Sequence, residues 1–435
     1  MNPLFLASGF TSYDMIIVAS VVIILSFFFG ELSRKTNIPS VLMLIVLGIF
    51  MKLIMDSMHL GDLDFFPVLE VLGIVGLIMI VLEAALELEL KREKMFPILN
   101  ALLIGLVGLL ISTWVAAVII QYFIPEMSTL NAWLYATPLS ILSSAIIIPS
   151  VASLNEKKKE FHIYESTFSD ILGIMLFYFL AGQVETAENA HGGGGIGEFF
   201  FLLFLTIAIS FIAGYVLILI FQNIRSHVKL FLLISVLLLL YALGKKMHLS
   251  SLLMILIFGL IIGNVKIFFQ GRLSKWLDMN KAKQIYQDLH IVTMETAFVV
   301  RTFFFVIFGL TISLASLASL QVAAISALIL ASIYVIRFIM LRLFVGSDIV
   351  PQLFIAPRGL ITVLLFYAIP KEAQVEAFEP GILLFIIIAT SLVMTFALIF
   401  DKNRTQAAVK KAMNIGIGFT KWKAPTVESE KEEGH

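Results

Sequence analysis

Apolar runs of about 17 to 25 residues recur along the whole sequence, and they restrict the possible fold more than any other feature. Each run is long enough to cross the hydrocarbon core of a bilayer as an α-helix. Hydrophobic residues make up 60% of the 435 residues and charged residues only 14%, which is far from the composition of a soluble globular domain. The sequence therefore predicts an all-α polytopic membrane protein.

We expect about thirteen transmembrane helices from the positions of these runs. They cover residues 13–31, 39–56, 67–88, 96–123, 131–153, 161–182, 197–222, 229–244, 249–265, 290–316, 321–346, 350–370 and 380–400. The first run lacks the basic flank and small-residue cleavage site of a signal peptide, so no removable leader is expected.

The loop charges predict an orientation, because cytoplasmic loops collect Lys and Arg. Most of these residues fall in the odd-numbered loops, whereas the even-numbered loops hold only Lys52, Lys245, Lys246 and Lys371. We therefore expect the N-terminus outside and the C-terminus in the cytoplasm of a cell membrane, with the bacterial inner membrane as the expected location.

Several function classes lack support in this sequence. Cysteine is absent, which excludes disulfides and thiolate metal sites, and the net charge of zero gives no attraction to nucleic acid. No phosphate-binding loop, HExxH pair or nucleophile elbow is present, so neither an enzyme nor a cofactor is expected. Metal binding by His191 with Glu188, beside a Gly-rich outer loop, is a weak possibility.

An internal repeat suggests how the chain is organised. The segment "NIPSVLMLIVLGIF" from Asn37 aligns without a gap with "HLSSLLMILIFGLI" from His248, and the alignment matches Gly48 to Gly259. These segments lie in the second and ninth spans, which the loop charges orient oppositely, as in many secondary transporters. A chance match between two apolar helices is the alternative.

The repeat divides the chain into two inverted-topology units of six helices each. We expect the first unit at 1–182, a Gly-rich outer loop and a linker helix at 183–228, the second unit at 229–400 and a short cytoplasmic tail at 401–435. For the tail, a basic amphipathic helix on the membrane surface and a disordered end are both open.

The fifth and twelfth spans correspond in this scheme, and both contain helix-breaking residues. The fifth reads "TPLSILSSAIIIPSVASL" and includes Ser143 and Ser144, and the twelfth reads "APRGLITVLLFYAIP" and includes Arg358. Interrupted helices at matching positions near the midplane commonly form ion sites. We therefore expect discontinuous, crossed helices here, although two Pro-kinked helices would give a similar pattern.

Acidic residues inside apolar helices are costly and need a partner or a water-filled cavity. In the sixth span, Glu165 and Asp170 point roughly 140° apart on a helix. Ser166 shares a face with Asp170, which gives an oxygen cluster suited to a hard monovalent cation. Asp170 lies roughly 13 Å from the inner end of the span, close to the midplane.

Glu165 has a candidate partner at a similar depth, Arg337 of the eleventh span, and this pair would neutralise both charges. Arg342, Arg301 and Arg358 remain alternative partners. Glu83 of the third span either reaches the ion cavity or bonds to a neighbouring hydroxyl. Arg301 is a possible countercharge near the site or a brace between helices.

Three motifs give a family resemblance that covers nearly the whole membrane region. "LEAALELELKRE" is similar to FEAALNLDLREL, "YESTFSDILG" to GESLLNDG and "PRGLITVLLFYAIP" to LRGAVSLALALSLP, all patterns of the monovalent cation/proton antiporter superfamily. The resemblance implies that Asp170 carries the ion and the proton, that Glu165 pairs with an Arg of the eleventh span, and that a homodimer works by elevator-type movement.

Two positions depart from the sodium/proton exchanger branch. Ser169 replaces the Asn before the essential aspartate, and Ala145 and Ile146 replace the Thr-Asp of the fifth span. The segment "LSSAIIIPSV" is closer to the potassium-efflux branch. The candidate ion ligands are Asp170, Ser166, Ser169, Glu83, Ser143 and Ser144. We expect Na⁺ to be bound at Asp170, with Li⁺ or K⁺ as alternatives.

A carboxylate in this position can hold a proton or a cation, one excluding the other, and this competition gives exchange. A single such carboxylate predicts an electroneutral exchange of one cation for one proton. The alternatives are a K⁺/H⁺ antiporter, a cation channel, a sodium-coupled symporter for an organic solute, and a sensor that has lost transport.

Overall fold

The computed structural model describes residues 12–36, 38–57, 66–88, 90, 92–151, 154–188, 196–224, 229–246, 251–268, 278–311 and 319–414. In this part of the chain every regular element is a helix. The α-helices are α1 (Ser12–Thr36), α2 (Ser40–Ser57), α3 (Phe66–Glu87), α4 (Met95–Phe123), α5 (Thr129–Ser140), α6 (Ser144–Ser150), α7 (Glu156–Glu188), α8 (Ile196–Phe221), α9 (Lys229–Lys246), α10 (Ser251–Gly263), α11 (Val265–Phe268), α12 (Met279–Thr311), α13 (Leu320–Phe344), α14 (Leu360–Tyr367) and α15 (Gly381–Asn414). Short 3₁₀ turns are η2 (Arg92–Lys94), η6 (Gln352–Phe354) and η7 (Lys371–Ala373).

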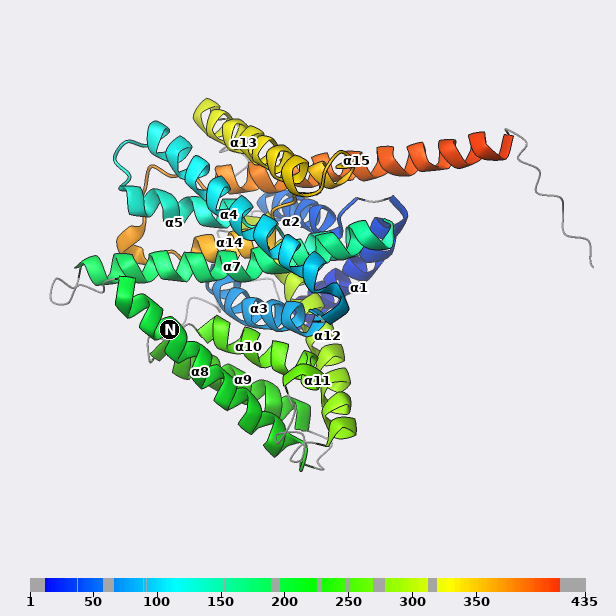
Figure 1. Cartoon of the computed structure of the whole chain (residues 1–435). Coiled ribbons are helices and arrows are strands. Elements are labelled where there is room, and N and C mark those ends of the chain that lie inside the picture. The colour runs from blue at the N-terminus through cyan, green and yellow to red at the C-terminus, as the bar shows by residue number, and fades with distance from the viewer. Residues whose placement is uncertain are drawn as a thin grey trace, which may run out of the picture.

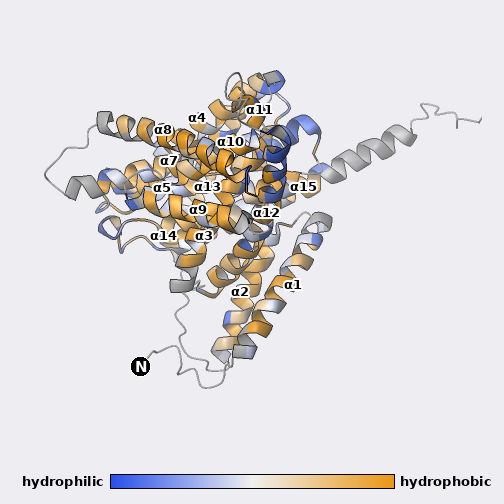
Figure 2. Cartoon of the chain, turned by 90° about the horizontal axis from the view of Figure 1, so that it is seen from below, coloured by the Kyte–Doolittle hydropathy of each residue, from blue (hydrophilic) through white to orange (hydrophobic). Residues whose placement is uncertain are grey.

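Within these residues, eight segments are long and apolar enough to cross a membrane, and the segment Thr129–Ser150 among them combines α5 and α6. Three shorter apolar segments are Ser40–Met55, Leu232–Gly244 and Ser251–Gly263. Figure 2 shows hydrophobic residues, coloured orange, along the long helices, for example α1 and α8. Large apolar side chains such as Phe28 and Trp114 are exposed on these flanks, as in a protein surrounded by lipid.

Glycines bring α2 and α12 into close contact. A side chain at Gly48 would collide with the main-chain oxygen of Val306, and one at Gly309 would collide with the main-chain oxygen of Ile45. Small residues let the backbones of two membrane helices approach closely. Close packing of this kind stabilises helix association in lipid, where the hydrophobic effect does not drive helices together.

A second glycine contact joins α10 to α3. A Cβ atom at Gly259 would lie 2.6 Å from Cβ of Ala85, so only glycine fits at this position. Beyond the end of α10, the Asn264 side chain donates from Nδ2 to the main-chain oxygen of Leu88 at 2.8 Å and accepts from the main-chain nitrogen of Leu90 at 2.6 Å. Asn264 therefore satisfies main-chain groups just after α3.

Helix α7 lies beside the two broken segments. Helix α7 contacts α4, α5 and α6, and α13 packs between α4 and α15. Figure 1 shows α7 passing beside α5 and α14, with α8, α9 and α10 grouped together on another side. This arrangement places the two broken segments next to α7.

The breaks predicted in the fifth and twelfth spans are present. Helix α5 ends at Ser140 and α6 begins at Ser144, and the residues between them are not helical. In the twelfth span, residues 355–359 separate η6 from α14. In the fifth span Pro138 and Pro149 lie inside α5 and α6 rather than at the break, whereas in the twelfth span Pro357 lies within the break.

Several helix ends differ from the sequence-based boundaries. Helix α7 covers Glu156–Glu188 instead of 161–182, α12 begins at Met279 instead of residue 290, and α15 continues to Asn414, beyond the boundary expected at 400. The added turns are polar, so the apolar pattern gave no indication of them. His191, the Glu188 side chain and residues 415–435 lie outside the described part.

Candidate functional site

The two broken segments meet at one hydrogen bond. The main-chain nitrogen of Ser143 donates to the main-chain oxygen of Pro357 at 3.0 Å. Gly359 allows this approach, since a Cβ atom there would collide with the hydroxyl of Ser143. The non-helical backbone of both segments is thus enclosed by protein, the condition under which unwound chain is tolerated at membrane depth.

Asp170 of α7 lies against this crossing. Its Oδ2 atom accepts a hydrogen bond from the main-chain nitrogen of Ser144 at 3.3 Å. Its Oδ1 atom is buried and has no hydrogen-bond partner among the described residues, and the whole residue is 2% exposed. Buried carboxylate oxygens are nearly always bonded, so this free oxygen indicates a place for a proton or a bound ion.

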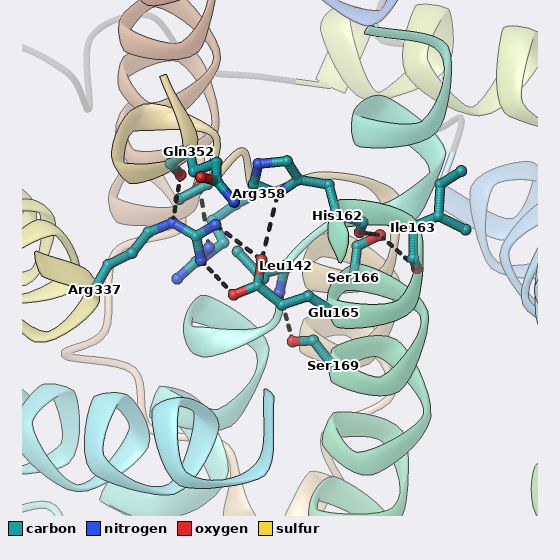
Figure 3. Close-up of polar contacts among 10 residues, drawn as sticks. Leu142, His162, Ile163, Glu165, Ser166, Ser169, Arg337, Gln352 and Arg358 are labelled. Carbon is teal, nitrogen blue, oxygen red and sulfur yellow. Dashed lines mark hydrogen bonds and ion pairs between the residues drawn. The ribbon is translucent and has the colours of Figure 1, made fainter. Parts of the chain in front are cut away.

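Two serines of α7 flank the carboxylate. Ser169 accepts a hydrogen bond at Oγ from the main-chain nitrogen of Leu142, at 3.0 Å, and so holds the interrupted segment against α7 (Figure 3). The Ser166 hydroxyl donates to the main-chain oxygen of His162 at 2.7 Å within its own helix. Its oxygen lone pairs remain available, as a cation ligand requires.

Glu165 and Arg337 form the ion pair that the sequence predicts. Arg337 Nη1 lies 2.8 Å from Glu165 Oε1, Nη2 lies 2.9 Å from Oε2, and Arg337 Nε donates to the main-chain oxygen of Gln352 at 3.0 Å. Each guanidinium nitrogen therefore donates one hydrogen bond, and two of them hold Glu165 in a bidentate arrangement (Figure 3). The pair links α7 to α13 and to the turn η6.

His162 is a neighbour of this pair that the sequence analysis missed. Its Nδ1 atom lies 3.4 Å from Glu165 Oε2, and the side chain is fully buried. Neither ring nitrogen makes a hydrogen bond within the described part of the chain. Its position one turn before Glu165 on a helix was the available sequence signal.

Arg358 is almost completely buried in the twelfth span's break. Its guanidinium donates from Nε to the main-chain oxygen of Leu139 at 2.7 Å and from Nη1 to that of Ala356 at 3.0 Å. Its main-chain nitrogen donates to Thr390 of α15 at 3.1 Å. Arg358 thus places a fixed positive charge at the carboxyl end of α5, where it also complements the helix dipole.

Glu83 and Arg301 pair with each other across α3 and α12. Arg301 Nη2 lies 2.9 Å from Glu83 Oε2, and both side chains are about one-fifth exposed. Of the two readings for Arg301, this contact supports the brace between helices. A direct role for Glu83 in ion binding stays a prediction.

The structure therefore gathers Asp170, Ser169, Ser143 and Ser144 at the crossing and places the Glu165–Arg337 pair beside it. The described residues contain no group of three or more histidines and acids that would hold a multivalent metal. One carboxylate with main-chain and hydroxyl oxygens around it matches the needs of a proton or a small monovalent cation.

Comparisons with known proteins give a consistent result. Two solved structures of the sodium proton antiporter MjNhaP1 from Methanocaldococcus jannaschii are similar. The structure at pH 8 has a TM-score of 0.65 at 17% identity, and the match covers 88% of this chain and 95% of that one. An electron-microscopy structure gives a TM-score of 0.63 at 17% identity, covering 96% and 100%.

At this identity the likeness establishes the fold. A search of curated proteins found no match. The family model described as sodium/hydrogen exchanger, transmembrane, matches residues 17–402, which is most of the chain and includes every site residue described above. The chain belongs to the sodium/hydrogen exchanger family, whose members are integral membrane ion transporters and not enzymes.

Proposed function

We propose that this protein exchanges Na⁺ for H⁺ across the membrane by competition at Asp170. The observation that carries the proposal is the free Oδ1 atom of a buried carboxylate placed at the crossing of two interrupted segments. A proton or a sodium ion can occupy that oxygen, and each excludes the other. Ser166, Ser169, Ser143 and Ser144 supply the nearby hydroxyl and main-chain oxygens.

The surrounding charges favour a one-to-one, electroneutral exchange. Arg337 neutralises Glu165 and Arg301 neutralises Glu83. Among the described residues, no cationic side chain lies within ion-pair distance of Asp170. Asp170 is therefore the carboxylate whose charge changes during the cycle, and either cargo cancels a single negative charge.

The packing of the helices supports two inverted repeats. If spans one to six correspond to spans eight to thirteen, α2 corresponds to α10 and α3 corresponds to α12. The contact of α2 with α12 then has its counterpart in the contact of α10 with α3. Gly48 and Gly259, which the repeat matches, provide the close approach in these two contacts.

The finer architecture follows from this assignment. We infer thirteen membrane crossings with the N-terminus outside and the C-terminus in the cytoplasm of a bacterial inner membrane. We further infer a homodimer whose ion-carrying part, including the crossing and α7, moves against the rest in an elevator-type cycle. Na⁺ is the first candidate cargo; Li⁺ is a second.

Replacing Asp170 tests the function. In proteoliposomes, Asp170→Asn should abolish sodium-driven proton movement, measured as recovery of a pH-sensitive dye after an imposed gradient. The control is Asp348→Asn, which removes a carboxylate that is 80% exposed, and it should exchange at the wild-type rate. Retained exchange in Asp170→Asn would show that the ion is carried elsewhere.

A K⁺/H⁺ exchanger is a second candidate, favoured by the fifth-span segment "LSSAIIIPSV", in which Ala145 and Ile146 replace the Thr-Asp pair. The same assay run with Na⁺, Li⁺ and K⁺ in turn distinguishes them. Cation flux without proton movement would instead favour a channel. Flux that requires an added organic solute would favour a symporter.

A further inference from the structure

A small cavity lies behind the crossing, between α4, α7 and α13. Its polar lining consists of Ser112, Ser140, Glu165, Ser169, Arg337 and Arg358. The cavity volume of about 40 Å³ is enough for roughly three water molecules or for one small ion with its partners. Gly108 also lines it, and a Cβ atom there would meet nothing within 4 Å.

The charges around this cavity are not balanced. Two guanidinium groups and one carboxylate line it. The charge of Arg337 is balanced by Glu165, which accepts from Nη1 and Nη2, and Nε donates to the main-chain oxygen of Gln352. Among the described residues, the Arg358 guanidinium donates to main-chain oxygens, and no carboxylate lies within 4 Å of it. The lining therefore carries a net charge of one positive unit.

Three of the lining groups have donors to spare. Among the described residues, Arg358 Nη2 and the Ser112 hydroxyl make no hydrogen bond, and the Ser169 hydroxyl accepts one but donates none. These donors come from the break, from α4 and from α7. The Arg358 Nη2 atom and the Ser112 hydroxyl are not sealed off by protein but open to the cavity, so a group that occupies it can accept hydrogen bonds from both.

We propose that this cavity binds one small monovalent inorganic anion of the halide class. Chloride accepts hydrogen bonds from hydroxyl and guanidinium groups, and its single charge cancels the excess charge of the lining. A cation is excluded because Glu165 is already occupied by Arg337 on both oxygens. The inference concerns binding only, so it does not depend on which cation the protein transports.

Chloride NMR line broadening on the purified full-length protein tests the proposal. The wild-type protein should broaden the chloride signal, and bromide should displace the bound chloride. Ser112→Ala removes one donor and should weaken binding about tenfold or more, since hydrogen bonds to charged groups are among the stronger ones. Gly108→Val fills the cavity and should abolish the bromide-sensitive broadening.

Two matched controls separate anion binding from damage to the fold. Thr113→Val removes a neighbouring buried hydroxyl that does not line the cavity, and Gly30→Val adds the same side chain where Cβ has open space. Both should keep wild-type broadening. Equal bromide-sensitive broadening in all five proteins would show that chloride binds outside the cavity. No broadening with the folded wild-type protein would show that the cavity holds only water, and either result would overturn the proposal.

Discussion

Glu165 and Asp170 show how two acids on one helix acquire different roles. Arg337 donates to both carboxylate oxygens of Glu165. Asp170 accepts one long main-chain hydrogen bond at Oδ2, and its Oδ1 atom has no partner among the described residues. A carboxylate held by a guanidinium keeps its charge, while a carboxylate without a cationic partner readily exchanges ligands. The division between a fixed pair and a working acid therefore rests on the neighbours and not on the residue type.

Breaking the Glu165–Arg337 pair should be costly for stability. Glu165→Gln or Arg337→Gln leaves a buried charge without its partner, which typically costs about 3 to 5 kcal/mol. The double variant Glu165→Gln/Arg337→Gln removes both charges and should recover part of that loss. Thermal unfolding of the purified protein in detergent measures all three.

The ion pair between Lys158 and Asp348, whose carboxylate is exposed, provides a comparison. Lys158→Gln should lower stability by less than about 1 kcal/mol, because Asp348 is 80% exposed and solvent screens the interaction. If the single Glu165 and Arg337 variants were as stable as the Lys158 variant, the buried pair would have no structural role.

Ser169 should matter through the backbone that it holds. Ser169→Ala leaves the main-chain nitrogen of Leu142 buried without an acceptor, at a cost of about 1 to 3 kcal/mol. The displaced segment should weaken apparent Na⁺ affinity in the dye-recovery assay while leaving exchange detectable. Thr167→Val removes a buried hydroxyl of the same helix that has no hydrogen-bond partner among the described residues, so this variant should keep the wild-type Na⁺ affinity.

For single residues, the sequence predicted the depth in the membrane better than the direction in which the side chain points. Glu165 and Arg337 were matched because both lie at a similar depth, and the structure contains that pair. Arg301 also carried a candidate role at the ion site, but its side chain turns toward Glu83. Which way a side chain points around a helix axis depends on packing between helices, and a single sequence does not contain that information.

The helices and their interruptions were more predictable than their exact ends. Both breaks were expected, because neither segment continues an apolar helical pattern through its Ser-rich or Arg-Gly stretch. Two Pro-kinked helices were the alternative for these spans, but in the fifth span Pro138 and Pro149 lie within α5 and α6 and not at the break. The break is instead stabilised from outside, by Ser169 and by the main-chain oxygen of Pro357.

The contact between α2 and α12 gives a prediction about element packing. Gly48→Ala places a methyl group into the main-chain oxygen of Val306 and should destabilise the protein by about 1 to 3 kcal/mol. Gly30→Ala in α1 has no neighbour within 4 Å and should be neutral or slightly stabilising, because alanine favours helix. Thermal unfolding of the two variants, side by side, decides whether α2 and α12 pack this closely.

The molecule as a whole has a contact pattern that fits two halves related by inversion. The α2–α12 and α10–α3 contacts correspond, and α4–α13 and α5–α14 join corresponding spans of the two halves. Inversion requires that related helices be an odd number of spans apart, and the thirteen predicted spans place them seven apart. The direction of each span therefore depends on the number of crossings, whereas the helix contacts do not.

The absence of cysteine from the chain makes that count directly testable. Glu126 lies exposed between α4 and α5, on the side predicted to face outside, and Lys157 lies exposed at the start of α7, on the side predicted to face the cytoplasm. A membrane-impermeant maleimide should therefore label Glu126→Cys in intact cells and Lys157→Cys only after permeabilisation. Both variants must first show wild-type exchange in proteoliposomes, which ensures that the labelled protein is folded. If only Lys157→Cys were labelled in intact cells, the predicted orientation would be inverted. Equal labelling of both variants in intact cells would place the two loops on one side of the membrane and so contradict the crossing formed by α5 and α6.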